Sequence, residues 1–140
     1  MSLSARQHTL IEDLLLIEDP QERLTAVIDF ARKSPPFPEA LRTEENRVTG
    51  CQSQVWLHSI PTSGSEFVVA GDSDSPLVRG LVVWTCNFFS QESPQSVSSS
   101  LPASDPLALV GLTKSLSASR QNGLASVRAR IAALARDYSE

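Results

Sequence analysis

The segment SPPFPEAL, residues 34–41, places three prolines within four positions. Proline lacks the amide hydrogen that a helix interior needs and fixes its own φ angle, so no helix can continue through this segment. We therefore expect a break here between an N-terminal part and a longer C-terminal part. An irregular connection is predicted from this segment up to about Val48.

The residues before this break predict a helical hairpin. Apolar residues recur at near-helical spacing after Ser4, which indicates a first helix over about residues 4–17. A second helix is expected to begin after Asp19, because Pro20 suits the first helical position and Glu22 stands where a capping-box carboxylate would lie. Two short helices therefore open the chain.

Two strand-like runs follow the irregular connection. QVWLHSI begins at Gln54, EFVVAG ends at Gly71, and the PTSGS between them suits a hairpin connection. Residues 76–89 are ambiguous, because their β-branched and aromatic content favours a strand whereas Ser75 followed by proline favours a helix start. Their length of about 14 residues and the helical spacing of their large apolar side chains favour a buried helix.

The remaining sequence predicts a loose connection and a final helix. Residues 90–104 contain seven serines, with room for one short helix after Pro94. An apolar stripe then predicts a last helix over about residues 119–136, following a serine cap. The sum is an α+β fold, in which a small antiparallel β-sheet is packed on one side by helices, and residues 1–140 are expected to form a single domain.

Composition excludes several classes of function. The net charge of −4 and the pI of about 5.2 argue against nucleic acid as a partner. No apolar run reaches membrane-spanning length and the N-terminus has no signal-peptide pattern, so we expect no membrane association and a cytoplasmic location. The two cysteines, Cys51 and Cys86, match neither a redox pair nor a zinc site, which favours a reducing compartment and no metal.

Charge is unevenly distributed along the chain. Nine of the 16 carboxylates fall within the first 50 residues, whereas residues 106–136 carry only basic charges. These are Lys114, Arg120, Arg128, Arg130 and Arg136. The basic segment is either a solvated helix face or a docking patch for an acidic partner protein.

Cys51 is the strongest candidate for chemistry. It lies between Gly50 and Gln52 in the predicted loop that leads into the hairpin, whereas an ordinary cysteine is a buried residue. A thiolate is a strong nucleophile where a second molecule can reach it. An unreactive loop cysteine remains the alternative for this position. Cys86, within VVWTCNFF, is expected to be a core thiol.

Other site chemistries find little support. A thiol hydrolase would need a histidine near Cys51, yet His8 lies in the first helix and His58 lies about 20 Å away if the strand is extended. Asp72 and Asp74 lack the later glutamate of a calcium loop, so turn formation and helix capping explain them better.

Arg120 stands at the start of the last predicted helix, where a cation opposes the helix dipole. A residue placed against a local rule can have a functional reason. The alternative is a solvated arginine.

Three segments together resemble the SufE family of sulfur acceptors, which includes CsdE. They are RVTGCQSQVW (47–56), GDSDSPLVRGL (71–81) and LTKSLSASRQNGL (112–124). The resemblance implies a SufE/NifU-like α+β fold. It also implies a partner, a PLP-dependent cysteine desulfurase of the SufS or CsdA type that the protein stimulates, and delivery of sulfur to downstream iron-sulfur scaffold proteins. The PLP would belong to the desulfurase, so the chain is expected to have no cofactor and to act as a carrier rather than an enzyme.

The resemblance assigns roles to individual residues. It implies that Cys51 accepts persulfide sulfur on a mobile loop that lies against a hydrophobic cavity. Arg120 matches a family arginine near this loop and is expected to bind the partner or stabilise the thiolate. Gln52, Gln54 and Asp74 match motif positions too, although hydrogen bonds that shape the loop and turn explain them equally well. Two alternatives stay open: a thiol-dependent hydrolase or peroxidase that uses Cys51, and a non-covalent desulfurase-binding module.

Overall fold

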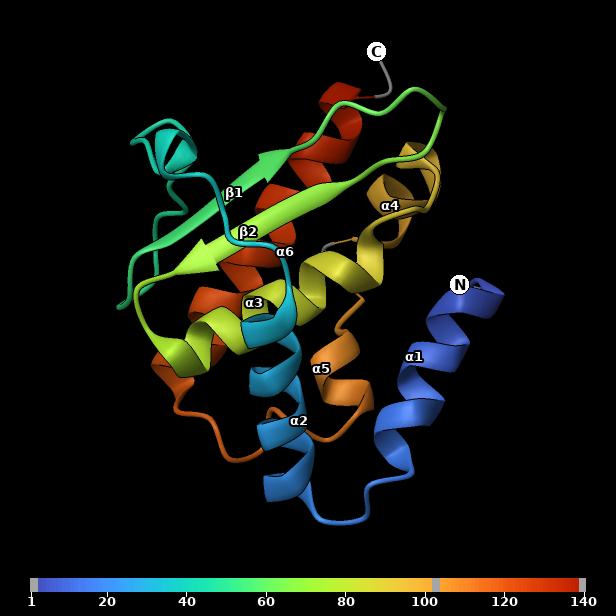
Figure 1. The fold of residues 1–140 in the computed structure, drawn as a ribbon, viewed down its shortest axis with the longest axis vertical. Coiled ribbons are helices and arrows are strands. Elements are labelled where there is room, and N and C mark those ends of the chain that lie inside the picture. Colours follow the sequence, from blue (N-terminus) through green and yellow to red (C-terminus); the bar gives the residue numbers. More distant parts are fainter. Residues whose placement is uncertain (1–2, 102–103, 139–140) are drawn as a thin grey trace.

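In the computed structural model, which describes residues 3–101 and 104–138, helices pack around a two-stranded antiparallel sheet (Figure 1). In chain order the elements are α1 (Ala5–Leu15), α2 (Pro20–Lys33), the 3-10 turn η1 (Glu39–Leu41), β1 (Val55–Ser59), β2 (Val69–Ser73), α3 (Pro76–Phe89), α4 (Pro94–Ser100), α5 (Pro106–Leu109) and α6 (Ala118–Tyr138). The predicted α+β class is confirmed.

The N-terminal helical hairpin forms as the sequence predicts. The Ser4 hydroxyl accepts a hydrogen bond from the Gln7 amide, and the Gln7 side chain accepts from the Ser4 amide, which together make a capping box. Asp19 caps α2 by accepting from the Gln21 amide. The helix ends at Lys33, directly before the proline-rich segment, which confirms the predicted break.

Strands β1 and β2 pair from Val55 with Ser73 to Ser59 with Val69. The second strand begins later than the sequence suggests, because Phe67 pairs instead with Glu92 beyond α3. Gly71 allows α3 to lie close to the sheet, since a Cβ there would come within 2.6 Å of a Val82 methyl carbon.

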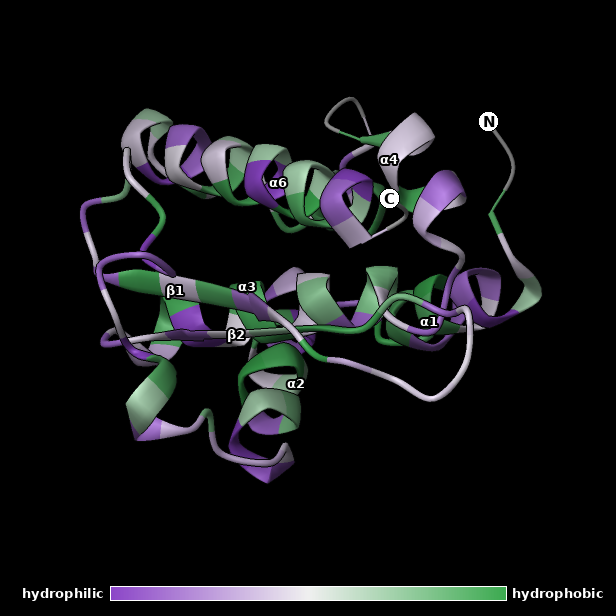
Figure 2. Cartoon of the chain, turned by 90° about the horizontal axis from the view of Figure 1, so that it is seen from above, coloured by the Kyte–Doolittle hydropathy of each residue, from purple (hydrophilic) through white to green (hydrophobic). Residues whose placement is uncertain are grey.

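The helices form layers around the sheet. Helix α6 covers one face of the sheet, α3 lies along β2, and α2 packs against α3 from the opposite side (Figure 2). The helical interpretation of residues 76–89 is confirmed, and Ser75 caps α3 through the Val78 amide. Gly80 lets α2 and α3 approach closely, because a Cβ there would lie 3.0 Å from the Ile28 Cα. These layers place the start of α6 beside the loop that precedes β1.

The serine-rich stretch is more regular than a loose connection. The short helix predicted after Pro94 forms as α4, Ser93 caps it, and Val97 is buried. Helix α4 packs against α6. Residues 102–103 of this stretch lie outside the described residues, and the short helix α5 was not predicted.

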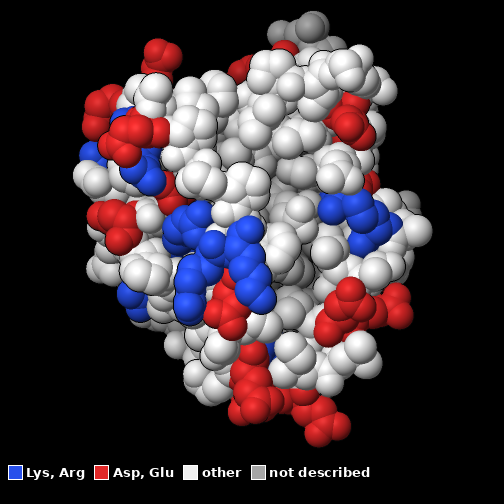
Figure 3. Space-filling view, viewed as in Figure 1, with Lys and Arg blue, Asp and Glu red and all other residues white. Residues whose placement is uncertain are grey.

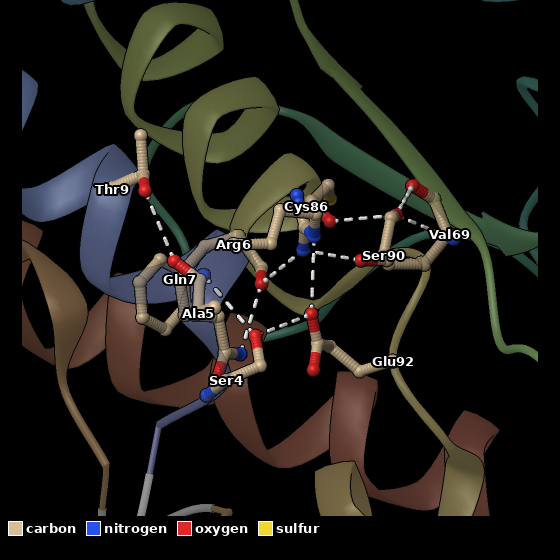
Figure 4. Close-up of polar contacts among 10 residues, drawn as sticks. Ser4, Ala5, Arg6, Gln7, Thr9, Val69, Cys86, Ser90 and Glu92 are labelled. Atoms are coloured by element: carbon tan, nitrogen blue, oxygen red, sulfur yellow. Dashed lines mark hydrogen bonds and ion pairs between the residues drawn. The ribbon is translucent and has the colours of Figure 1, made fainter.

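A polar cluster attaches α1 to the end of α3 (Figure 4). The buried carboxylate of Glu92 accepts hydrogen bonds from Arg6 Nε at 3.0 Å and from Ser4 Oγ at 2.9 Å. Arg6 also donates to the carbonyls of Phe88 and Ser90, and Gln7 donates to the Phe88 carbonyl. No sequence pattern indicated this cluster, since the residues of α1 and the partners they bond lie more than 80 positions apart along the chain.

No helix in the described ranges 3–101 and 104–138 has both the length and the apolar character needed to cross a membrane.

Candidate functional site

Cys51 lies on the loop that leads from Val48 into β1. The backbone turns just before it at Gly50, whose φ of +90° falls in the left-handed region that side chains disfavour. A Cβ at Gly50 would also come within 2.8 Å of the Ser126 hydroxyl oxygen of α6. Glycine at this position therefore permits both the turn and the close approach of the loop to α6.

The Cys51 thiol is half-buried against α6. Its sulfur donates a hydrogen bond to the Gly123 carbonyl at 3.4 Å, and a Cβ at Gly123 would lie 3.3 Å from the same sulfur. A glycine inside a helix costs about 1 kcal/mol relative to alanine, and contact with Cys51 gives a reason for it. Burial raises the pKa of the Cys51 thiol, so the protonated form is favoured in this position.

A cavity of about 20 Å³ lies beside Cys51, between β1, α3 and α6. Its apolar wall comes from Val55, Val78, Leu81, Leu124 and Val127, and its polar wall from Gln52, Ser53, Ser119 and Arg120. A space of this size holds a group about as large as one water molecule. The loop thiol therefore borders a small and largely apolar space.

Arg120 lies near the start of α6 and lines the same cavity as Cys51. Ser117 caps the helix by accepting a hydrogen bond from the Arg120 amide at 3.2 Å, which confirms the predicted serine cap. Within the described part of the chain, the exposed Arg120 guanidinium makes no hydrogen bond or ion pair. The structure thus brings Cys51, Gln52 and Arg120 to one cavity.

Gln54 and Asp74 do not line this cavity but bond to each other. The Gln54 backbone amide donates to Asp74 Oδ1 at 3.0 Å, and the Asp74 backbone amide donates to the Gln54 backbone carbonyl at 3.2 Å. These bonds close the end of the sheet where β1 begins and β2 ends. The structural explanation of the two motif positions is thereby supported, and their participation in partner binding stays a prediction.

Asp72 has a different role from the turn and capping role that the sequence suggested. It lies in β2 with only 2% of its surface exposed. Arg42 donates to its Oδ2 from Nε at 2.8 Å and from Nη2 at 2.6 Å, and Arg79 Nε donates to its Oδ1 at 2.9 Å. A buried carboxylate needs such partners, so Asp72 joins the irregular connection, the sheet and α3. The interpretation of Asp72 as a turn or capping residue was therefore wrong.

Neither histidine of the chain lies beside Cys51, where it could act as a base for the thiol. His8 is exposed on α1 and His58 lies in β1, and neither lines the cavity. Across the residues that the structure describes, no group of three or more histidine, cysteine or acidic side chains could hold a metal ion. Cys86 is a core thiol as predicted, and burial raises its pKa to about 12.

The basic C-terminal segment is partly used inside the protein. Arg128 forms an ion pair with Asp105 at 3.3 Å, and Arg130 donates to the carbonyls of Arg47 and Glu45. The docking hypothesis for an acidic partner is thus weakened for Arg128 and Arg130.

Charge also gathers elsewhere on the surface. On the face shown in Figure 3, lysine and arginine side chains gather where α2 meets α3, and carboxylates gather near the turn between α1 and α2.

Comparison with known proteins identifies the family. Residues 8–135 match the family described as SufE, Fe-S metabolism associated domain. An uncharacterised SufE-like protein of Rhizobium meliloti is 36% identical over 125 residues, which cover 87% of this chain and 89% of the relative. A second such protein, from Rhizobium etli, is 37% identical over 125 residues, covering 87% of this chain and 84% of the relative. The chain belongs to the SufE family, which supports a role in iron-sulfur metabolism linked to sulfur transfer.

A solved structure shows the same fold. It is the solution structure of a hypothetical protein from Thermus thermophilus, with a TM-score of 0.77 and 21% sequence identity over 98% of each chain. At this identity the likeness concerns the fold alone.

Gly123 is the site residue that sequence reasoning missed. Its signal was present, because it is a glycine inside a predicted helix, where glycine costs about 1 kcal/mol relative to alanine. The identity of its contact, the Cys51 thiol 72 positions away, became visible only in the fold.

Proposed function

We propose that this protein accepts sulfur from a PLP-dependent cysteine desulfurase on Cys51 and passes it to proteins that assemble iron-sulfur clusters. The observation that carries the proposal is a half-buried loop thiol beside a small apolar cavity, in a chain of the SufE family. A loop is suited to this task because the thiol has to reach a cysteine inside another protein.

The transfer follows thiol-disulfide exchange. The Cys51 thiolate attacks the outer sulfur of a persulfide, R–S–SH, on the desulfurase. The new S–S bond forms on Cys51 as the S–S bond of the desulfurase breaks. The desulfurase cysteine leaves as a thiolate and takes up the proton released by Cys51, so one thiol and one persulfide exchange partners without net oxidation. PLP serves the desulfurase, and the acceptor itself requires no cofactor.

The cavity suits the product of this transfer. A persulfide adds one atom to the Cys51 side chain, and the adjoining space of about 20 Å³ accommodates a group of roughly that scale. Its aliphatic wall would keep water and small thiols away from the outer sulfur. Shielding of this kind limits loss of the sulfur before delivery.

Arg120 is the one charged residue among those that line the cavity. It lines the cavity at the exposed end of α6, and its guanidinium has no partner within the described residues. A cation near a thiol favours the thiolate. We propose that Arg120 stabilises the Cys51 thiolate or binds the desulfurase, and that Gln52 shapes the loop between them.

Two other functions predict different behaviour. A thiol hydrolase or peroxidase would turn over substrate without a desulfurase, and the absence of both histidines from the cavity lining argues against an activated Cys-His pair. A non-covalent desulfurase-binding module would still stimulate the desulfurase after Cys51→Ser.

Intact-mass spectrometry tests the proposal. The protein is incubated with a SufS- or CsdA-like desulfurase and cysteine, and the wild type is compared with Cys51→Ser and with Cys86→Ala as the matched control. We expect a gain of about 32 Da per sulfur atom on wild type and on Cys86→Ala, removed by a thiol reductant and absent from Cys51→Ser. No added sulfur on wild type, with the desulfurase active in the same reaction, would reject the carrier function.

A further inference from the structure

Three leucines are exposed at the end of the molecule where α1 is followed by α2. Leu15 and Leu16, at the C-terminal end of α1, have 44% and 80% of their surface exposed, and Leu109 of α5 has 51%. The other exposed large apolar residues of the described ranges, Phe30 and Ile60, lie beside a different groove, next to the proline-rich segment. Single apolar residues on a surface are ordinary, whereas a group of them marks a site of interaction.

Arg23 of α2 brings these leucines together. Its Nε donates to the Ile17 carbonyl at 2.6 Å, and its Nη1 donates to the Val110 carbonyl at 3.2 Å. One guanidinium therefore holds the residue after Leu16 close to the residue after Leu109, at the end of the molecule where α1, α2 and α5 meet (Figure 1). The leucines thus belong to one apolar patch, although they come from opposite halves of the chain.

A hollow of about 220 Å³ adjoins the patch, between the first turn of α2 and the segment that follows α5. Its walls include the apolar residues Pro20, Leu24 and Leu112. Gly111, two residues after Leu109, also lines it. Side chains that contribute most to protein-protein binding usually fill pockets in the partner. The hollow therefore offers a place for an apolar side chain of a docked protein.

Excess negative charge borders the patch. Five exposed carboxylates lie within eleven consecutive residues: Glu12, Asp13, Glu18, Asp19 and Glu22. Across residues 3–101 and 104–138, none of the five forms an ion pair. Two basic side chains lie nearby, but Arg23 points inward to backbone carbonyls and Lys114 lines the hollow. The charge of this end of the molecule therefore stays negative, as the carboxylates in Figure 3 show.

We propose that the three leucines, the hollow and the five carboxylates, together the leucine-acid surface, form a docking site for a partner protein whose contact surface is apolar and bordered by lysine and arginine. Such a partner would remove the leucines from water and place positive charge beside the carboxylates. A second copy of this chain suits the surface less well. A symmetric dimer through this face would bring the two sets of carboxylates together.

The leucine-acid surface is separate from the Cys51 site. None of its residues lines the cavity beside Cys51, whose walls come from the cysteine loop, β1, α3 and α6. A protein docked on the leucine-acid surface would leave the Cys51 cavity uncovered, so the chain would be able to hold a second protein while Cys51 reacts with a first. The inference goes beyond the proposed function and does not depend on sulfur transfer.

The test is an NMR titration of the ¹⁵N-labelled protein with a synthetic amphipathic peptide of leucine and lysine. A peptide of about 18 residues is long enough to form a helix on binding. We expect the shifts of backbone amides to concentrate in residues 12–22 and 106–112. Shifts centred on the groove beside Phe30 and Ile60, or spread evenly over the protein, would overturn the inference.

Control peptides separate the two kinds of contact. A peptide of the same pattern with glutamate in place of lysine should not bind, because its charge matches that of the leucine-acid surface. A peptide with glutamine in place of leucine keeps the positive charge but has no apolar face. It should bind at least about tenfold more weakly than the leucine-lysine peptide. Equal binding of these two basic peptides would reduce the site to general charge attraction and reject the docking surface.

A double variant tests the apolar part on the protein. Leu16→Ser combined with Leu109→Ser should weaken binding of the leucine-lysine peptide at least about tenfold, because both leucines are exposed and lie at the centre of the surface. Ile60→Ser is the matched control, since it also replaces an exposed apolar residue. It should keep the wild-type affinity. Unchanged affinity in the double variant would contradict the proposal.

A second double variant tests the carboxylates. Glu12→Gln combined with Glu18→Gln should weaken binding about threefold at low salt, and the difference from wild type should shrink as salt screens the charges. Glu66→Gln, at an exposed carboxylate in the connection between β1 and β2, is the control and should have no effect. Equal effects of the two changes would show that only net charge matters, against the proposal.

These outcomes are separable from those of the proposed function. Peptide binding is measured without a desulfurase, and sulfur transfer to Cys51 is measured as added mass. The Leu16→Ser, Leu109→Ser variant should lose the peptide and still accept sulfur. A wild type that binds the peptide at residues 12–22 and 106–112 but accepts no sulfur would retain the docking surface and reject the carrier.

Discussion

The two cysteines of this protein lie in contrasting surroundings. Cys86 is enclosed in α3 with 3% of its surface exposed, whereas Cys51 lies half-buried on a loop and touches α6 through a backbone carbonyl. Burial raises the pKa of both thiols. The difference lies in what must move to expose them, since α3 would have to leave the core but the loop only has to leave the surface of α6. Partial burial on a loop is thus compatible with a reactive thiol.

The largest effect is expected from substitution of Cys51, the proposed functional thiol. Cys51→Ser should abolish stimulation of a cysteine desulfurase, because a hydroxyl cannot accept sulfur by exchange. Cys86→Ala should retain stimulation within about twofold, as expected for a residue away from the site. The measurement is the rate of alanine formation from cysteine with each variant added. Equal stimulation by Cys51→Ser and wild type would favour the non-covalent module.

The second effect concerns alkaline pH and the core thiol. Ionisation of Cys86 is disfavoured in the folded state, with a pKa of about 12 against an ordinary value of 9.0. The unfolded state can ionise this thiol at a lower pH than the folded state can. The folded state therefore keeps its full stability below pH 9, and the free energy of unfolding falls as pH rises toward 12, by up to about 1.4 kcal/mol per pH unit. Urea unfolding of wild type and Cys86→Ala at pH 8, 9 and 10 checks this. The wild type should lose stability relative to the variant above pH 9, and parallel curves would contradict the assignment.

The third prediction concerns stability, for which Cys86 should matter more than Cys51. Cys86→Ser should lower the free energy of unfolding by about 1–3 kcal/mol, because it places a hydroxyl in an apolar site. Cys51→Ser should stay within about 0.5 kcal/mol of wild type, as is usual outside the core. Denaturant titration of both variants at pH 7 gives the values. A larger loss for Cys51→Ser would show that the loop contributes to stability as the core does.

The smallest effect is expected from a change at Gly50, which tests how closely the loop lies against α6. Gly50→Ala should cost about 1 kcal/mol, because alanine disfavours the positive φ of this residue. Its Cβ would also meet the Ser126 hydroxyl, so the loop should lie further from α6. We expect faster alkylation of Cys51 together with this modest loss in stability. A matched Gly64→Ala variant should show neither change.

Much of the fold could be predicted because its signals are local. The caps at Ser4, Asp19 and Ser75 and the proline-rich segment specify where helices begin or end, and the structure has them there. The start of β2 could not be predicted in the same way. Its boundary depends on pairing of Phe67 with Glu92, which lies on the far side of α3.

The candidate site was predicted in part. The motif containing Cys51 and the segment containing Arg120 were recognised separately, and the fold brings both to one cavity. Gln54 and Asp74, from the same motifs, instead join the ends of the two strands. Asp72 was misread as a turn residue, because the two arginines that bind it, Arg42 and Arg79, come from other elements.

The sequence by itself determined helices α1, α2, α3, α4 and α6, the hairpin and the family, since capping residues, apolar spacing and motif residues act within a few positions of each other. Only the tertiary structure decided that a glycine of α6 faces the loop cysteine, that the space beside it is largely apolar, and that burial there raises the pKa of the thiol. These properties arise from burial and contact between segments 72 positions apart, and a linear pattern does not contain such distances.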